Sequence, residues 1–434
     1  MRNFSTERII QFGIGLCLIL NSLQAYSIFS IPVPWMGTIF LVFLSLFFFL
    51  QARFFLFPGA VAFLFFTCWV VVDFLVILIM RPSEPVSLAR ATLGYYPYIM
   101  LRLLNIVVCA FSICLIFWLI YKGRKKQLVS LVVNLGLIVS VYSIYVYFAQ
   151  THGWPEFSRT RLGTGGDEQA TTFTYAFHRA MGTFREPSHL AEWLVLPLFV
   201  SLYENKKLSN FKAALMATVL LMTGSLTGIA GFLGGSACAA IIGFRFSWSA
   251  LWPVIKIVGL TVFAGVVFAL FVNNSTDKKN SSFVVVLWER VEPILLEKGL
   301  KSSNRDYVYY YLDHKPFTIF GDGIGNPNIE FSKFLDSDIT ASFLSLYVAT
   351  LYSAGYIGFS ILVLFLLCPV VLFYRKRSKI KDNQFFYLFS AYFGWLIVFS
   401  IHSEELNFQF GVCYALVVGT LYLEAHEKKN ANPL

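Results

Sequence analysis

Long apolar runs, separated by short polar segments, dominate the hydrophobic pattern of this chain. A helix needs about 20 apolar residues to cross the hydrocarbon core of a bilayer. The pattern therefore predicts an all-α polytopic membrane protein with about twelve transmembrane helices. The predicted spans cover residues 9–30, 34–50, 54–80, 98–121, 127–149, 190–203, 213–224, 228–244, 251–272, 341–374, 384–401 and 408–424.

Two of these runs are too long for one upright helix. The run over 213–244 holds Gly224-Ser225-Leu226-Thr227-Gly228 near its centre, which predicts a helical hairpin that turns at the membrane surface. The run over 341–374 exceeds one span, and we expect its first third to lie in the membrane interface.

Composition supports the membrane prediction. The chain is 57% hydrophobic and only 13% charged, whereas soluble domains carry about 25% charged residues. The net charge of +10 is concentrated in clusters between apolar runs, as positive-inside topology requires, so it does not indicate nucleic-acid binding. All seven cysteines lie in apolar runs, and their spacing shows neither a disulfide framework nor a metal-binding pattern.

The basic clusters predict the orientation of the chain. Residues 122–126, 206–212, 375–381 and 428–429 are rich in Lys and Arg and should face the cytoplasm. With twelve spans, these clusters and both termini fall on one side. The N-terminal run lacks a small-residue cleavage site, and we expect it to stay as the first span.

The chain divides into five segments on this basis. Three bundles of transmembrane helices cover 1–149, 190–272 and 341–434. Two polar loops separate them, at 150–189 and 273–340, and both are large enough to form a small cap on the non-cytoplasmic side. Arginines in these loops oppose the positive-inside bias, which favours an anionic ligand there; pairing with nearby carboxylates is the alternative. Five of the six histidines also lie in or beside the non-cytoplasmic segments: His152, His178, His189, His314 and His402.

The densest polar motif is 178–189, which reads His-Arg-Ala-Met-Gly-Thr-Phe-Arg-Glu-Pro-Ser-His. It resembles the Arg-x-x-Gly-x-x-x-Glu-Pro element of bacterial O-antigen polymerases (Wzy) and related exopolysaccharide polymerases. Three further stretches resemble the membrane domain shared by O-antigen polymerases and ligases. They are the serine-centred turn at 223–228, the loop from Arg305 through 314–316 to 321–326, and the Gly-x-x-Gly at 353–358.

This resemblance implies a GT-C-like membrane glycosyltransferase with its active site on the periplasmic face of the bacterial inner membrane. It implies transfer of a growing glycan from polyprenyl pyrophosphate to a lipid-linked repeat unit, without a cofactor or metal. Lipid-linked oligosaccharides, a chain-length regulator and a flippase are the implied partners.

Arginine suits the pyrophosphate leaving group because its guanidinium donates two parallel hydrogen bonds to an anion. We expect Arg179, Arg185 and Arg305 to contact pyrophosphate or sugar phosphate, with Arg290 as a fourth candidate. Structural ion pairs are the alternative for each. Asp322 and Asn326 are candidates for binding sugar hydroxyls, while the glycines between them favour a tight turn.

The acceptor hydroxyl needs a proton acceptor. Glu186, His189 and His314 are the candidates. Pro187 favours a helix that begins at or after it, so Glu186 is alternatively a helix N-terminal partner or an ion-pair partner. His189 and His314 are alternatively ordinary hydrogen-bonding residues.

Two other functions fit parts of the pattern. The first is an O-antigen ligase, but the ligases usually carry His-Asn before the Gly-x-x-Gly helix, and this chain has Asp-Ser-Asp-Ile-Thr at 336–340. The second is a flippase for lipid-linked oligosaccharides. A flippase should place its charges inside the helix bundle, whereas the sequence places them mainly in two long loops.

Overall fold

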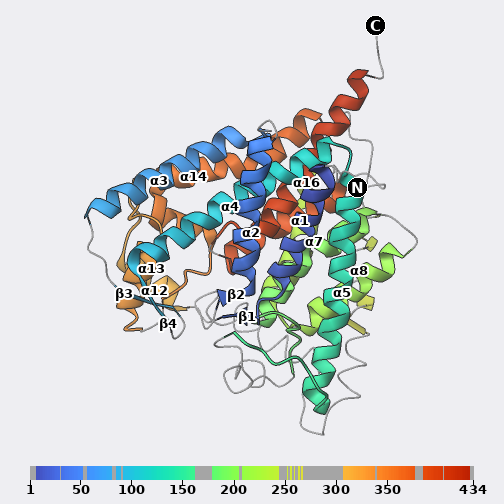
Figure 1. Ribbon diagram of the computed structural model, residues 1–434, viewed down its shortest axis with the longest axis horizontal. Helices are drawn as coiled ribbons and strands as arrows, with labels where there is room; N and C mark the ends of the chain where they lie inside the picture. Colours follow the sequence, from blue (N-terminus) through green and yellow to red (C-terminus); the bar gives the residue numbers. More distant parts are fainter. Residues whose placement is uncertain are drawn as a thin grey trace.

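The computed structural model describes residues 6–29, 31–51, 56–80, 85–88, 91–161, 178–204, 208–243, 306–337, 340–376, 385–403 and 405–430, and isolated positions between 252 and 266. The described part is all-α, apart from two short antiparallel ribbons (Figure 1). The elements are α1 (Thr6–Ser22), β1 (Ser27–Ile28), β2 (Ile31–Pro32), α2 (Val33–Gln51), α3 (Ala60–Met80), β3 (Pro85–Leu88), β4 (Ala91–Gly94), α4 (Tyr95–Tyr121), α5 (Lys125–His152), α7 (Pro187–Glu204), α8 (Ser209–Met222), α9 (Leu226–Gly243), α12 (Asp306–His314), α13 (Asn326–Phe334), α14 (Leu346–Lys376), α15 (Phe385–Ile401) and α16 (Phe408–Asn430).

Many of the helices are as apolar as membrane segments, and three of them are also long enough to cross a bilayer. Within the described residues, α4, α5 and α14 are long and apolar enough to cross a bilayer, and six further apolar helices are shorter. Large side chains such as Phe43, Phe65 and Leu364 are more than 60% exposed on the outer faces of α2, α3 and α14. Exposed apolar surface on this scale fits contact with lipid, so the fold is that of a membrane-embedded helical protein.

Most predicted spans coincide with helices. The predicted span 9–30 is too long, because α1 ends at Ser22 and strand β1 lies at Ser27–Ile28. The run over 251–272 lies largely outside the described residues. The run over 213–244 does contain two helices, and Gly224 (φ +55°) lies in the break between α8 and α9. Both helices pack against α7; in addition, α8 lies against α5 and α9 lies against α15.

Small residues let α9 and α15 approach closely. A Cβ atom added at Gly235 would meet the Ser390 carbonyl oxygen at 2.5 Å, and one at Gly394 would meet the Gly231 carbonyl oxygen at 2.7 Å. Helix pairs in membranes use such small residues to gain packing contacts. This pair and α4, α7 and α16 make up much of the buried core.

Helix α14 is kinked at Gly355, where φ is +65° and ψ is −171°. The kink frees backbone groups for other partners. The Trp69 Nε1–H of α3 donates to the Ala354 carbonyl at 2.9 Å, and the amides of Asp322 and Gly323 donate to the carbonyls of Tyr352 and Ser353 at 2.8 and 2.9 Å. The loop that follows α12 is thereby fixed to α14.

The two ribbons, α12 and α13 lie at the end of the molecule opposite the C-terminus (Figure 1). An aromatic cluster joins α12 and α13 to the first half of α14, with Tyr311, Phe331, Phe343 and Tyr352 buried together. This layer covers one end of the helices and frames the cavities described next.

Candidate functional site

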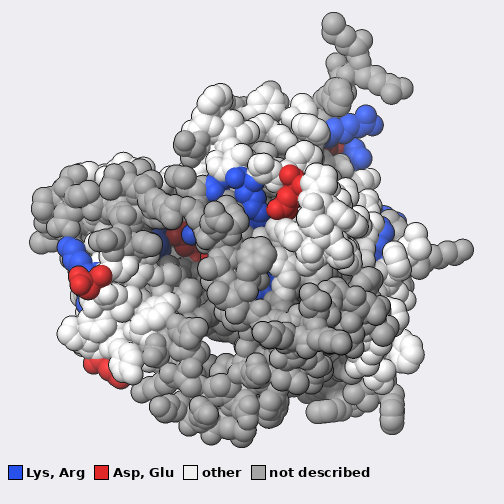
Figure 2. Space-filling model, turned by 90° about the horizontal axis from the view of Figure 1, so that it is seen from below, with Lys and Arg blue, Asp and Glu red and all other residues white. Residues whose placement is uncertain are grey.

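A polar cavity of about 530 Å³ lies between α2, α4, α7 and the connections that follow α1 and α15. We call it the arginine cavity because Arg102, Arg161 and Arg185 line it. Seen from the end that carries the ribbons, basic and acidic side chains lie beside one another near the middle of the face (Figure 2). Its other lining residues are Asn21, Gln24, Pro34, Trp35, Thr38, Asn105, His189, Glu192, Ser342, His402, Ser403, Glu405, Asn407 and Gln409.

Arg161 reaches the cavity because its segment is fixed to the turn after α1. The Arg161 amide donates to the Ala25 carbonyl at 3.1 Å, and its guanidinium donates to the Gln24 carbonyl at 3.0 Å. Burial, together with the neighbouring charge of Arg185, lowers the pKa of Arg161 to about 10. The positive charges of Arg161 and Arg185 repel each other. An anion bound beside them would offset this repulsion, so the pair is suited to anion binding.

The first half of the motif at 178–189 is structural. Arg179 is 8% exposed, and its Nε donates to the Thr223 carbonyl at 2.7 Å, so it holds the turn between α8 and α9. Arg159 donates to the carbonyls of Gly182 and Phe184 at 2.8 and 3.0 Å. Gly182 has φ +52°, and a Cβ there would collide with Ser143. Arg179 was predicted to bind substrate, but it is not among the residues that line the cavity.

The second half of the motif is presented to the cavity. Helix α7 begins at Pro187, as the sequence predicts, and the amides of His189 and Leu190 bond back to the Glu186 carbonyl. Arg185 and His189 line the cavity. The ligand atoms of Glu186, His189 and His402 all lie within 4.8 Å of one another. The second half of the motif therefore places the guanidinium of Arg185, the carboxylate of Glu186 and the imidazole of His189 close together.

A hydrogen-bonded group lies behind His189. The Nδ1 of His402 lies 3.1 Å from the Oε2 of Glu192. The side-chain amide of Asn407 donates a hydrogen bond to the Oε1 of Glu192 at 3.1 Å. Glu192 is only 7% exposed. The rings of His189 and His402 meet edge to face, with centroids 4.9 Å apart. Burial, and then the charge of His402, lower the pKa of His189, which lies just before the predicted span.

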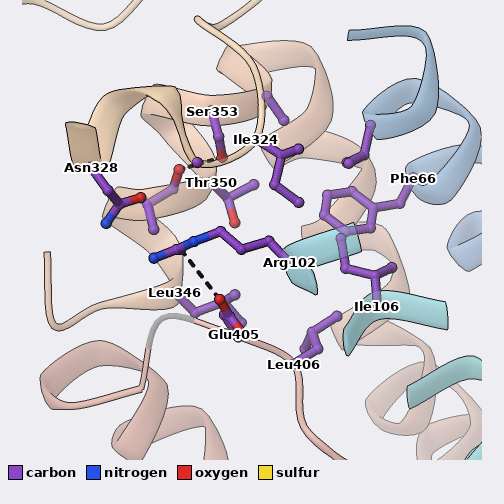
Figure 3. Close-up of a pocket in the computed structure, with 14 residues that line it drawn as sticks. Phe66, Arg102, Ile106, Ile324, Asn328, Leu346, Thr350, Ser353, Glu405 and Leu406 are labelled. Carbon is purple, nitrogen blue, oxygen red and sulfur yellow. Dashed lines mark hydrogen bonds and ion pairs between the residues drawn. The ribbon is translucent and has the colours of Figure 1, made fainter. Parts of the chain in front are cut away.

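A second, apolar pocket adjoins the arginine cavity. Phe66, Val70, Ile106, Ile324, Leu346 and Leu406 give it an apolar wall, and Arg102 and Glu405 line both spaces. Figure 3 shows the Arg102 guanidinium pointing toward Asn328 and Glu405, with Phe66 and Ile106 on the other side. The Arg102 Nη1 lies 3.3 Å from the Glu405 Oε1, and the Asn105 amide also donates to Glu405. A charged pair thus marks the boundary between a polar and an apolar compartment.

The glycine loop at 321–325 has a structural role. The Lys315 Nζ lies 2.7 Å from the Asp322 Oδ2 and also pairs with Glu330. Burial opposes the charge of Lys315, but these two hydrogen bonds outweigh it and raise its pKa. Asn326 is buried, accepts a hydrogen bond from the Tyr95 hydroxyl and donates to the Asp322 carbonyl at 2.8 Å. These contacts place Asp322 and Asn326 outside the arginine cavity.

His314 is also separate from the cavity. It ends α12, lines a separate hollow of about 390 Å³ with Lys315 and Lys333, and packs its ring against Phe334 at 4.9 Å. The two remaining candidates, Arg290 and Arg305, lie outside the described residues. Of the nine candidates named from the sequence, the structure brings together Arg185, Glu186 and His189.

Arg102 was not among the candidates, which all came from the polar loops and their edges. It lies inside a predicted span. A charged residue within an apolar run is by itself a signal for function, so the sequence does contain a signal that could have identified Arg102. The chain matches no protein-family model and no curated protein sequence. Its site is therefore interpreted from its own geometry.

Proposed function

We propose that this protein is a membrane glycosyltransferase of the polysaccharide-polymerase type. It moves a growing glycan from polyprenyl pyrophosphate to the non-reducing end of a lipid-linked repeat unit. The observation that carries the proposal is the shared boundary of the two spaces at Arg102 and Glu405. A lipid pyrophosphate is an amphiphile with the same division, because its headgroup is anionic and its tail is apolar. At about 50 Å³ the apolar pocket has room only for the first carbons of the tail, next to the headgroup.

The chemistry of transfer matches the groups in the arginine cavity. An acceptor hydroxyl oxygen attacks the anomeric carbon of the donor, and the bond from that carbon to the pyrophosphate oxygen breaks. Arg161 and Arg185 stabilise the negative charge that develops on the leaving pyrophosphate. The proton of the acceptor hydroxyl passes to Glu186 or His189, which lie beside these arginines. The products are the extended glycan and free polyprenyl pyrophosphate.

The proposal includes a cellular setting. The active site faces the periplasm of a bacterium, the chain spans the inner membrane about twelve times, and a chain-length regulator and a flippase act with it. The resemblance of the motifs at 178–187, 223–228 and 353–358 supports this setting. The same resemblance favours an O-antigen or a related glycan as the polymer and keeps the ligase as an alternative in the same class.

The test is the gel profile of surface glycan from a deletion strain complemented with variants. Arg161→Ala and Arg185→Ala should reduce polymer synthesis by about 100-fold or more, the usual effect of removing one preorganised donor. Arg124→Ala is the matched control, because Arg124 pairs with Glu7 at 2.7 Å and does not line the cavity. A ladder unchanged by both cavity variants, at normal protein levels, would refute the assigned site. A ladder unchanged by the deletion itself would remove the O-antigen polymerase assignment.

One observation favours a second function. Arg102 and Glu192 belong to α4 and α7, so the cavity carries charges between helices as a flippase would. Vesicles containing the purified protein and a labelled lipid-linked repeat unit separate the two functions. Glycosidic bond formation supports the transferase, and translocation without bond formation supports the flippase.

A further inference from the structure

Three side chains with metal-binding atoms converge at the start of α7. They are Glu186, His189 and His402, and their ligand atoms all lie within 4.8 Å of one another. We propose that these three residues bind a divalent transition-metal ion, for which Zn²⁺ is the best-matched candidate. This assignment stands independently of the glycosyltransferase proposal, because it rests only on the donor set and its support.

The hydrogen bonding around His402 matches that of a metal ligand. Its Nδ1 contacts the Glu192 carboxylate at 3.1 Å, which leaves Nε2 as the nitrogen available for a metal. Histidines that bind metals almost always donate their other ring N–H to a carboxylate or a carbonyl, which fixes the ring and raises the basicity of the ligand. Glu192 is itself buried and held by Asn407. The supporting group is therefore in place around His402.

The donor set selects the class of ion. Two imidazoles and one carboxylate are the ligands of many zinc sites that keep an open coordination position, whereas Ca²⁺ and Mg²⁺ prefer oxygen ligands throughout. Tetrahedral zinc would bring the ligand atoms to about 3.4 Å apart, given Zn–N bonds of about 2.0 to 2.1 Å. Glu186 is exposed at its position before α7, so rotation of its side chain can close this difference.

Electrostatics connects the ion to the cavity. Arg161 and Arg185 oppose a cation at this place, and Glu186 and Glu192 favour one. An anion that contacts both the ion and the arginines removes the repulsion. Binding of the metal and of pyrophosphate should therefore be mutually favourable, since such coupling is reciprocal. This second part rests on pyrophosphate binding in the proposed function, whereas metal binding itself does not. Glu186 and His189 cannot accept the proton of the acceptor hydroxyl while they bind the ion, so in the metal-bound protein neither is the general base.

The experiment uses the full chain, purified in detergent through a tag without histidines and treated with EDTA. Zinc is added back, excess is removed by gel filtration, and the metal content is measured by mass spectrometry. Wild type and the exposed-histidine control His152→Ala should retain one zinc per chain. The double variant His189→Ala/His402→Ala should retain none. Glu192→Gln should weaken zinc binding by about 10- to 100-fold, the usual cost of losing a supporting carboxylate.

Two results would overturn the site. One is a wild-type chain that retains no zinc. The other is a zinc affinity left unchanged by Glu186→Gln, a substitution at an exposed position before α7. A Co²⁺-substituted protein gives an independent readout, because the loss of its visible absorption in His402→Ala reports the ligand directly. Added inorganic pyrophosphate should raise the zinc affinity. If zinc binds but pyrophosphate has no effect, the metal site stands and the pyrophosphate part of the proposed function fails.

Discussion

The Arg102 guanidinium of α4 lies 3.3 Å from the carboxylate of Glu405, a residue in the connection between α15 and α16. Their side chains are 16% and 33% exposed, and the Arg102 guanidinium also lies over the Tyr98 ring at 5.1 Å. The pair closes one end of an apolar pocket, and each charge helps to compensate the other. Removal of one partner takes away that share of the compensation next to apolar side chains.

A double-mutant cycle tests this pairing. We expect Arg102→Met and Glu405→Gln each to lower the thermal unfolding midpoint in detergent. The double variant should be more stable than the sum of the single effects predicts, with a coupling of roughly 0.5 to 3 kcal/mol. Strictly additive effects would show that the two charges do not interact in the protein.

The buried position of Arg179 predicts an effect on stability. Arg179→Ala removes the donor to the Thr223 carbonyl, and a buried acceptor left without its partner costs about 1 to 3 kcal/mol. The unfolding midpoint should fall, and the yield of folded protein with it. Arg185→Ala serves as the contrast, since Arg185 lines the cavity and its replacement should change the midpoint little. Equal unfolding midpoints for the two variants would contradict the division of the motif into a structural first half and a second half that faces the arginine cavity.

Close contact at the α14 kink makes Gly355 intolerant of a side chain. A Cβ at Gly355 would collide with the backbone of Ile319 and Gly321, and its φ of +65° disfavours any L residue. Gly355→Ala should therefore destabilise the protein strongly. The matched control is Gly123→Ala, because Gly123 has φ +76° but nothing within 4 Å of the added atom. The difference in unfolding midpoint between the two variants isolates the cost of the collision.

His178 predicts an acid dependence of stability. Burial and the nearby charge of Arg159 lower the pKa of His178 to about 4, against an ordinary value of 6.5. The unfolded chain therefore binds the proton first as the pH falls. Between pH 6.5 and about 4 the free energy of unfolding should decrease by up to about 1.4 kcal/mol per pH unit from this group. Thermal unfolding of His178→Gln across this range should show a shallower slope, whereas the control His152→Gln should follow wild type.

The apolar pocket predicts a dependence on the lipid tail. Ala349 lines the pocket and is 8% exposed. The pocket holds about 50 Å³, room only for the first carbons of a tail, which long-chain and short-chain prenyl donors share. Under the proposed function, Ala349→Phe should therefore fill the space and reduce turnover of both donors. The comparison of the variant with wild type in a purified assay is the measurement, with the unfolding midpoint as the check on folding. Unchanged turnover of both donors would remove the pocket as the tail site.

The helical architecture was predictable because hydrophobic pattern alone specifies membrane helices. The start of α7 at Pro187 and the break between α8 and α9 also followed from local sequence. What local sequence does not contain is proximity between distant segments. His402 lies more than 200 residues after His189, yet their rings touch. The sequence alone therefore does not bring His402 to Glu186 and His189.

The sequence alone could not distinguish the structural role of Arg179 from the position of Arg185 at the cavity. Arg179 and Arg185 occur in one motif, but the tight turn around Gly182 sends one into the protein and the other to the cavity. Polarity is the same at both positions, and only the backbone geometry distinguishes them. The same holds for Asp322 and Asn326, whose polar groups are engaged by Lys315 and Tyr95.

The attachment of the glycine loop to the kink of α14 makes the two segments a single mechanical unit. Asp322 and Gly323 bond to the carbonyls of Tyr352 and Ser353, and the neighbouring residues Ala349 and Thr350 form a wall of the apolar pocket. A shift of α13 relative to the helices therefore shifts that wall as well. The width of the apolar pocket therefore depends on the position of the layer formed by α12 and α13. A ligand that moves either the pocket wall or this layer has to move both.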